Sequence, residues 1–189
     1  MALWGASDAD ESKPKWLTTA QKKEVFANTS GWVVEAGSTM TGNGNANAQP
    51  EVLCCIGNLS TLLAGADLTE VEWITTTADK SAGILMQVRV RWNEAVTVTG
   101  TPRLTVTNDT NANHVLSYLS GSGSNELVFS LTISGGDSAT DADDVLSIAG
   151  QTIDLNSGTI KDTSGTADDA LLVISGAQGT AAGTITVVA

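Results

Sequence analysis

The sequence predicts a mainly β protein built around an antiparallel two-layer β-sandwich, and three observations support this prediction. Between Gly83 and Gly165, short runs of alternating apolar and polar residues are separated by clusters of Gly, Asn, Asp and Ser. The chain contains 19 glycines and only 16% charged residues, a balance typical of turn-rich β proteins. Turn signals recur about every 8–12 residues, as expected for the strands of a sandwich.

Residues 1–68 are predicted to form a small N-terminal module that differs from the rest of the chain. Thr18 or Thr19 is a suitable N-cap for a short helix. Two apolar segments flank a loop rich in Gly and Asn, which is the pattern of a β-hairpin, at residues 31–35 and 51–56. We therefore expect this module to contain a β-hairpin and at most one short helix.

Residues 69–189 are predicted to form the sandwich. The clearest strand covers residues 83–92, where every second side chain is apolar and the side chains between them are polar or charged. A second alternating strand at residues 126–133 directs Phe129 inward, as the first directs Trp92 inward. Further strands are expected at residues 70–76, 96–98, 103–107, 114–119, 145–148, 159–161, 171–174 and 184–188.

The charge of the chain restricts the classes of partner. The net charge is −12, and the isoelectric point is about 4.2. Such a surface repels phosphate groups and anionic lipids, so neither nucleic acid nor a membrane is expected as a direct partner. Residues 1–35 are nearly neutral and contain four of the nine basic residues. No signal peptide is recognisable, so we expect synthesis and folding in the cytoplasm of the cell that makes the protein.

Three segments carry a first resemblance to a known family. They read WNEAVTVTGTPRL, YLSGSGSNELVF and LNSGTIKD, at residues 92–104, 118–129 and 155–162. Together, and in this order, they resemble the motifs of bacterial immunoglobulin-like (Ig-like) repeats, which occur in tandem in large surface adhesins. The resemblance covers about half of the chain and implies an Ig-like antiparallel β-sandwich. It implies little about function, because one fold carries many activities.

Four shorter segments carry a second resemblance. They read MALWG, KPKWL, GWV and EVLCCIG, at residues 1–5, 13–17, 31–33 and 51–57. They resemble small virion structural proteins of tailed phages, especially the marine T4-like phages of cyanobacteria. In that group an Ig-like domain sometimes follows the same N-terminal module. The resemblance implies a non-enzymatic virion protein in which residues 1–68 anchor the chain and residues 69–189 are displayed.

The candidate partner-binding residues lie in the N-terminal module: Trp4, Lys13, Lys15, Trp16 and Trp32. A segment of this length cannot bury three indoles by itself, so burial against another virion subunit and burial in the chain's own core both remain open. Lysines beside them would meet acidic groups on that subunit, and a plain solvated face is the alternative. The expected partners are other virion proteins, above all the major capsid protein; a homo-oligomer and weak contact with host-surface glycans are further alternatives.

These expectations combine into a capsid decoration protein on the exterior of the virion, made in the host cytoplasm. Two alternatives stay open from the sequence. One is a neck or tail component of the same particle that contacts the host. The other, from a different class, is an adhesin or carbohydrate-binding module, although a sugar-binding module usually exposes a flat aromatic platform, and the alternation directs Trp92 and Phe129 inward.

Only one part of the sequence suggests an ion site, and none suggests catalysis. Four acidic residues lie within eight positions of a Gly-rich loop: Asp137, Asp141, Asp143 and Asp144. Oxygen ligands on a loop suit Ca²⁺, and a solvated turn is the alternative. His114 is the only histidine, and no nucleophile elbow, phosphate-binding loop or dinucleotide fingerprint is present. We therefore expect no enzymatic activity and no cofactor besides this Ca²⁺.

Overall fold

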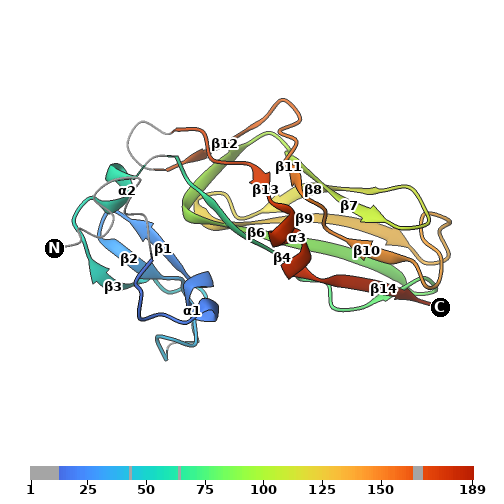
Figure 1. Ribbon diagram of the computed structural model, residues 1–189, viewed down its shortest axis with the longest axis horizontal. Helices are drawn as coiled ribbons and strands as arrows, with labels where there is room; N and C mark the ends of the chain where they lie inside the picture. The colour runs from blue at the N-terminus through green and yellow to red at the C-terminus, as the bar shows by residue number, and fades with distance from the viewer. Residues whose placement is uncertain (1–12, 43, 64, 164–167) are drawn as a thin grey trace.

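The computed structural model of the protein describes residues 13–42, 44–63, 65–163 and 168–189. Strands account for 47% of the residues and helices for 9%, against a usual strand content of about 20–25%. The prediction of a mainly β protein is therefore confirmed. Figure 1 shows a small N-terminal module and a larger barrel placed end to end, with the C-terminal strand reaching the barrel end remote from the module.

The N-terminal module consists of five short elements, namely α1 (Thr19–Lys23), β1 (Val25–Asn28), β2 (Gly31–Val34), β3 (Glu51–Cys55) and α2 (Leu59–Leu62). A capping box begins α1: the Thr18 hydroxyl accepts from the Gln21 backbone N–H, and the Gln21 side chain accepts from the Thr18 N–H. The three strands form an antiparallel meander in which β2 is central.

This module is richer in structure than the sequence indicated. A hairpin with at most one short helix was expected; instead β1 adds a third strand and α2 a second helix. The four residues of β1 follow α1 after a single residue, so they are too few to show the alternation that identifies a strand. The four-residue helix α2 has no side-chain N-cap, which removes the signal that usually marks a helix start.

The remaining elements form the barrel and its covering segments. They are β4 (Leu68–Trp73), β5 (Ala78–Asp79), β6 (Gly83–Thr99), β7 (Arg103–Asn108), β8 (His114–Ser120), β9 (Ser124–Ser134), β10 (Val145–Ser147), β11 (Gln151–Thr152), β12 (Thr159–Asp162), β13 (Val173–Ile174), α3 (Gly176–Ala182) and β14 (Thr184–Val188). Most of them coincide with strands expected from the alternating pattern.

Strand pairing closes these elements into a ring rather than leaving two separate layers. The ring runs β6-β5-β14-β10-β7-β8-β9, and β9 pairs back with β6. The short strand β5 makes the closure, because it pairs in parallel with β14 and also meets β6 at Asp79 and Gly83. The alternating pattern does not indicate β5, so the prediction was a two-layer sandwich where the structure has a closed barrel of seven strands.

The longest strand, β6, occupies the centre of the molecule. It contains 17 residues and merges two strands that the sequence separated. Its register with β9 shifts between Arg91 and Val96, after which it pairs with β12. Its first half lies between β4 and β9. At Glu94 it also pairs in parallel with Ala27 of β1, which joins the module and the barrel in one 12-stranded sheet.

Each of the two units has its own hydrophobic core. The barrel core contains the inward faces of β6 and β9, and Trp92 and Phe129 are fully buried there as the alternation predicted. The indole N–H of Trp92 donates to the carbonyl of Leu171 over 3.0 Å. The module core is smaller and consists of Leu17, Val25, Ala27, Trp32, Val34, Leu59 and Leu63.

Candidate functional site

The structure separates the three tryptophans that the sequence grouped as partner-binding residues. Trp16 precedes α1 and is 61% exposed. Trp32 lies in the middle strand of the meander with 0% exposure, inside the module core. The expectation that Trp32 binds a partner is therefore wrong, because three strands and two helices supply enough apolar surface to bury one indole. Trp4 lies outside the described residues.

The lysines near α1 also differ from one another. Lys15 is exposed beside Trp16. Lys13 turns inward, and its Nζ donates to the backbone carbonyl of Lys22 over 2.7 Å. Burial lowers the pKa of Lys13 to about 8, although the nearby carboxylate of Glu70 acts in the opposite direction. The Lys13 ammonium is half-buried and already hydrogen-bonded inside the chain, so Lys15 and Trp16 are the exposed ones among the described residues predicted to bind a partner.

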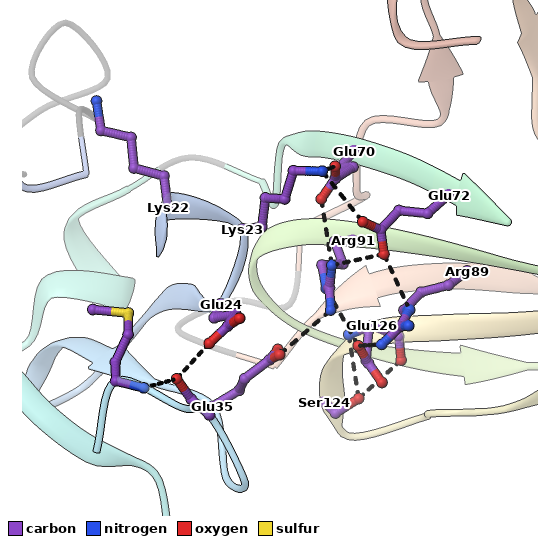
Figure 2. A network of polar contacts seen from close by, with 12 residues as sticks. Lys22, Lys23, Glu24, Glu35, Glu70, Glu72, Arg89, Arg91, Ser124 and Glu126 are labelled. Atoms are coloured by element: carbon purple, nitrogen blue, oxygen red, sulfur yellow. Dashed lines mark hydrogen bonds and ion pairs between the residues drawn. The ribbon is translucent and has the colours of Figure 1, made fainter. Parts of the chain in front are cut away.

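A cluster of charged side chains connects the module to the barrel, and Figure 2 shows it from close by. We call it the Arg91 cluster; its members are Arg91, Arg89, Glu35, Glu70, Glu72, Glu126 and Lys23. The side chain of Arg91 is only 7% exposed. Such a cation must be surrounded by acceptors, because an unpaired buried charge is very costly.

Arg91 contacts four carboxylates from three different parts of the chain. Its Nη2 lies 3.4 Å from Glu35 at the end of β2, and its Nε lies 3.3 Å from Glu126 of β9. Its Nη1 lies 3.4 Å from Glu70 and 3.0 Å from Glu72, both on β4. The contact with Glu35 reaches across from the module, so this one guanidinium binds the module to the barrel.

The surrounding groups show how the charges balance. Burial raises the pKa of Glu35, and the positive charge of Arg91 opposes this shift. Hydrogen bonding to Glu70 raises the pKa of Lys23, which also lies 3.3 Å from Glu72. Each carboxylate of the cluster has a cationic partner. This arrangement can fix two units in one orientation.

The Arg91 cluster was not among the sites predicted from the sequence. A signal was nevertheless present, because Arg89 and Arg91 share the outer face of β6, and Glu70 and Glu72 share one face of β4. Residues two apart in a strand lie on the same face, so two pairs of opposite charge on neighbouring strands can meet. What the sequence could not provide was the pairing of β4 with β6.

The acidic loop, the second predicted site, does not assemble as an ion-binding cluster. Within the described residues, no three His, Cys, Asp or Glu side chains come together in a way that could hold a metal. Asp137 accepts a hydrogen bond from the backbone of Ala139, and the exposed Asp141 pairs with Lys80. Asp143 is exposed, with a positive φ of 71°. The Ca²⁺ site expected on Asp137, Asp141, Asp143 and Asp144 is therefore not formed in this structure.

Asp144 instead organises the loop after β7. It is 1% exposed and accepts hydrogen bonds from the Asn108 side chain over 2.7 Å, the Asn111 side chain over 3.0 Å, the Thr110 hydroxyl and the Asp141 backbone. Burial by itself raises the pKa of Asp144, but these hydrogen bonds outweigh it and hold the pKa below its usual range. This carboxylate is structural because donors of its own chain surround it.

His114 belongs to the same buried group. Its Nε2 lies 3.4 Å from the Nδ2 of Asn108, and burial lowers its pKa while Asp144 acts in the opposite direction. His114 is buried at the start of β8. Its neighbours position it within a loop-stabilising network.

Replacing Asp144 with asparagine is expected to lower the free energy of unfolding by about 1.5–3 kcal/mol at pH 7, since the charged acceptor is lost and one new N–H₂ faces other donors. The folded-state pKa is depressed, so this stability is present above the unfolded pKa of about 4 and is lost as the pH falls through the folded value. Urea unfolding measured between pH 7 and pH 2 checks both points. Equal stability of the variant and the wild type at pH 7 would contradict this role.

No described helix has the length and apolar character that a membrane span requires. The longest of them, α3, has seven residues. No protein-family model matches the chain, and no curated protein and no solved structure is significantly similar to it.

Proposed function

We propose that this chain is a non-enzymatic structural protein of a phage virion, most simply a capsid decoration protein. In this proposal the N-terminal module docks on another virion subunit, with the major capsid protein as the first candidate. The barrel then projects from the particle surface. The four sequence segments of the module that resemble virion proteins support the proposal, and so does the surface that the module presents.

The observation that carries the docking proposal is the exposure of Trp16. Exposed tryptophan is uncommon on a protein surface, and at interfaces it is among the side chains that contribute most to binding. Trp16 lies beside the exposed Lys15, so an apolar anchor and a cation are available together. Both are held on the folded module, because Leu17, the next residue, is buried in the module core.

The geometry of the whole chain suits display. The module and the barrel lie end to end in Figure 1, so a particle surface bound by the module would leave the remote end of the barrel free. We also propose that the barrel is a variant of the Ig-like sandwich, in which β5 closes one side of two otherwise facing sheets. The three Ig-like sequence segments, which fall on β6 to β7, on β8 to β9 and before and within β12, support this.

Replacing Trp16 with alanine is expected to weaken binding to purified particles by at least tenfold, with little change in stability, because an exposed side chain contributes to the interface and not to the core. The measurement is co-sedimentation of the purified protein with particles from which it has been removed. Val173→Ala is the matched control, since Val173 is also 61% exposed but lies on the barrel.

Two results would contradict the proposal. The first is absence of the protein from purified particles, which would reject the virion assignment. The second is full binding by the Trp16→Ala variant together with loss of binding by the control, which would place the docking surface on the barrel.

A further inference from the structure

A cavity of about 430 Å³ lies between the module and the barrel. The module contributes Phe26 of β1 and five residues that follow β2, while the barrel contributes Arg89 of β6 and residues 123–126 around the start of β9. The five residues are Glu35, Ala36, Ala46, Ala48 and Pro50. Its volume is within the range of about 300–1,000 Å³ that is usual for small-molecule sites, and such sites favour the boundary between two structural units.

The two sides of this cavity differ in chemistry. The side formed by the module is largely apolar and consists of Phe26, Ala36, Ala46, Ala48 and Pro50. The opposite side is polar and consists of Arg89, Ser124, Asn125 and Glu126, with Glu35 at its border. Figure 2 shows Glu35 approaching from the module toward the group that contains Ser124 and Glu126. A ligand for this cavity needs one apolar face and one face that hydrogen-bonds.

The charges on the polar side are already balanced. Glu126 lies 3.2 Å from the Nη1 of Arg89, and Glu35 lies 3.4 Å from the Nη2 of Arg91. A charged ligand would have to displace one of these pairs, which costs free energy. Each carboxylate still has lone pairs that can accept further hydrogen bonds, because one carboxylate offers about four acceptor positions. The cavity therefore favours a neutral ligand that carries hydroxyl donors.

The side chain of Asn125 provides a second, independent observation that points to a ligand. It is 3% exposed and borders the cavity, and its Nδ2 has no hydrogen-bond partner among the described residues. A buried amide N–H₂ without an acceptor is unfavourable, so native proteins rarely retain one unless another molecule accepts from it. This Nδ2 has almost no accessible surface, so a ligand in the cavity reaches it only when the Asn125 amide turns toward the cavity.

We propose that this cavity binds a neutral saccharide unit. The hydroxyl groups of a pyranose donate to Glu35 and Glu126 and accept from Asn125, while its C–H face lies against Ala48 and Pro50. This proposal goes beyond particle docking and does not rest on it, since it concerns the free protein. A single ring in an open cavity binds weakly, with a dissociation constant in the millimolar range.

The test is an NMR titration of the isotope-labelled full chain with glucose, galactose, mannose, maltose and lactose, and with glucosamine and glucuronate as charged comparators. The expected result is saturable shifts for at least one neutral sugar, confined to amides near residues 46–50 and 123–126, and weaker responses to both comparators. Two results would overturn the proposal: no saturable response to any neutral sugar, or a stronger response to a charged comparator.

A variant that fills the cavity provides a second test of sugar binding. Ala48→Trp is expected to weaken sugar binding at least tenfold, because the indole occupies the space of the sugar ring. Ala112→Trp is the control, since Ala112 is exposed in the loop after β7 and does not border the cavity. If Ala48→Trp does not fold, Ala46→Trp replaces it, as Ala46 is exposed. Unchanged affinity in a folded cavity variant would overturn the assignment, and so would equal loss in the control.

Discussion

Replacing Arg91 with alanine is expected to lower the free energy of unfolding by about 3–5 kcal/mol, which is a large part of the stability of a domain of this size. The reason is the set of carboxylates that the substitution leaves behind. Glu35, Glu70, Glu72 and Glu126 all lie within 3.4 Å of the guanidinium and would repel one another in its absence. Lys23 and Arg89 would still pair with Glu70, Glu72 and Glu126, whereas Glu35 would lose the ion pair that it makes with Arg91.

Urea unfolding followed by circular dichroism measures this loss. Arg103→Ala is the matched control, because Arg103 is exposed and its replacement removes the same charge from the chain. Arg91→Lys is expected to fall between the two, since an ammonium group keeps the charge but cannot contact four carboxylates in a planar fork. If Arg91→Ala proved as stable as the control, the cluster would not be what holds the module on the barrel.

Replacing Trp32 with alanine should lower the free energy of unfolding by about 3–5 kcal/mol, because it leaves a cavity in the smaller of the two cores. The module core has few members, so neighbouring side chains cannot fill the space. Trp32→Phe is expected to lower it much less. Phenylalanine keeps most of the apolar volume and removes an indole N–H that is buried without a hydrogen-bond partner in the described part of the chain.

The same measurement on Trp16→Ala provides the comparison. Trp16 is exposed, so its removal should change stability by no more than about 0.5 kcal/mol. The two variants are therefore expected to behave in opposite ways. Trp32→Ala loses stability, whereas Trp16→Ala loses binding to particles. A stable Trp32→Ala variant, or a strongly destabilised Trp16→Ala variant, would show that the assignment of core and surface is reversed.

The strands that could be predicted are those in which apolar and polar residues alternate. The alternating pattern identified β6 and β9, including the inward direction of Trp92 and Phe129, because a strand with one buried face repeats every two residues. The closure of the barrel could not be predicted. It depends on β5, which has two residues and pairs with strands far away in the chain, and so short a segment carries no periodic signal.

The candidate sites were predictable only in residue type. Three tryptophans near the N-terminus indicated an interface, but the sequence alone does not show which of them the fold buries. The difference arises from the central position of Trp32 in a three-stranded sheet. Likewise, Asp144 belongs to an acidic run in the sequence, yet donors from the loop after β7 make it structural. In both cases the role of the residue depends on contacts with segments that are distant in the sequence.

The many partners of β6 also bear on how the chain reaches its native state during synthesis. This strand pairs with β1, which begins at Val25, and with β12, which ends at Asp162. The first half of β6 is covered by β4 and β9, but its second half lacks β12 until residue 162 has been made. Folding that waits for such distant segments is slow, and an uncovered strand of this length invites pairing with other chains. Newly made copies are thus most prone to aggregation before β12 has emerged from the ribosome.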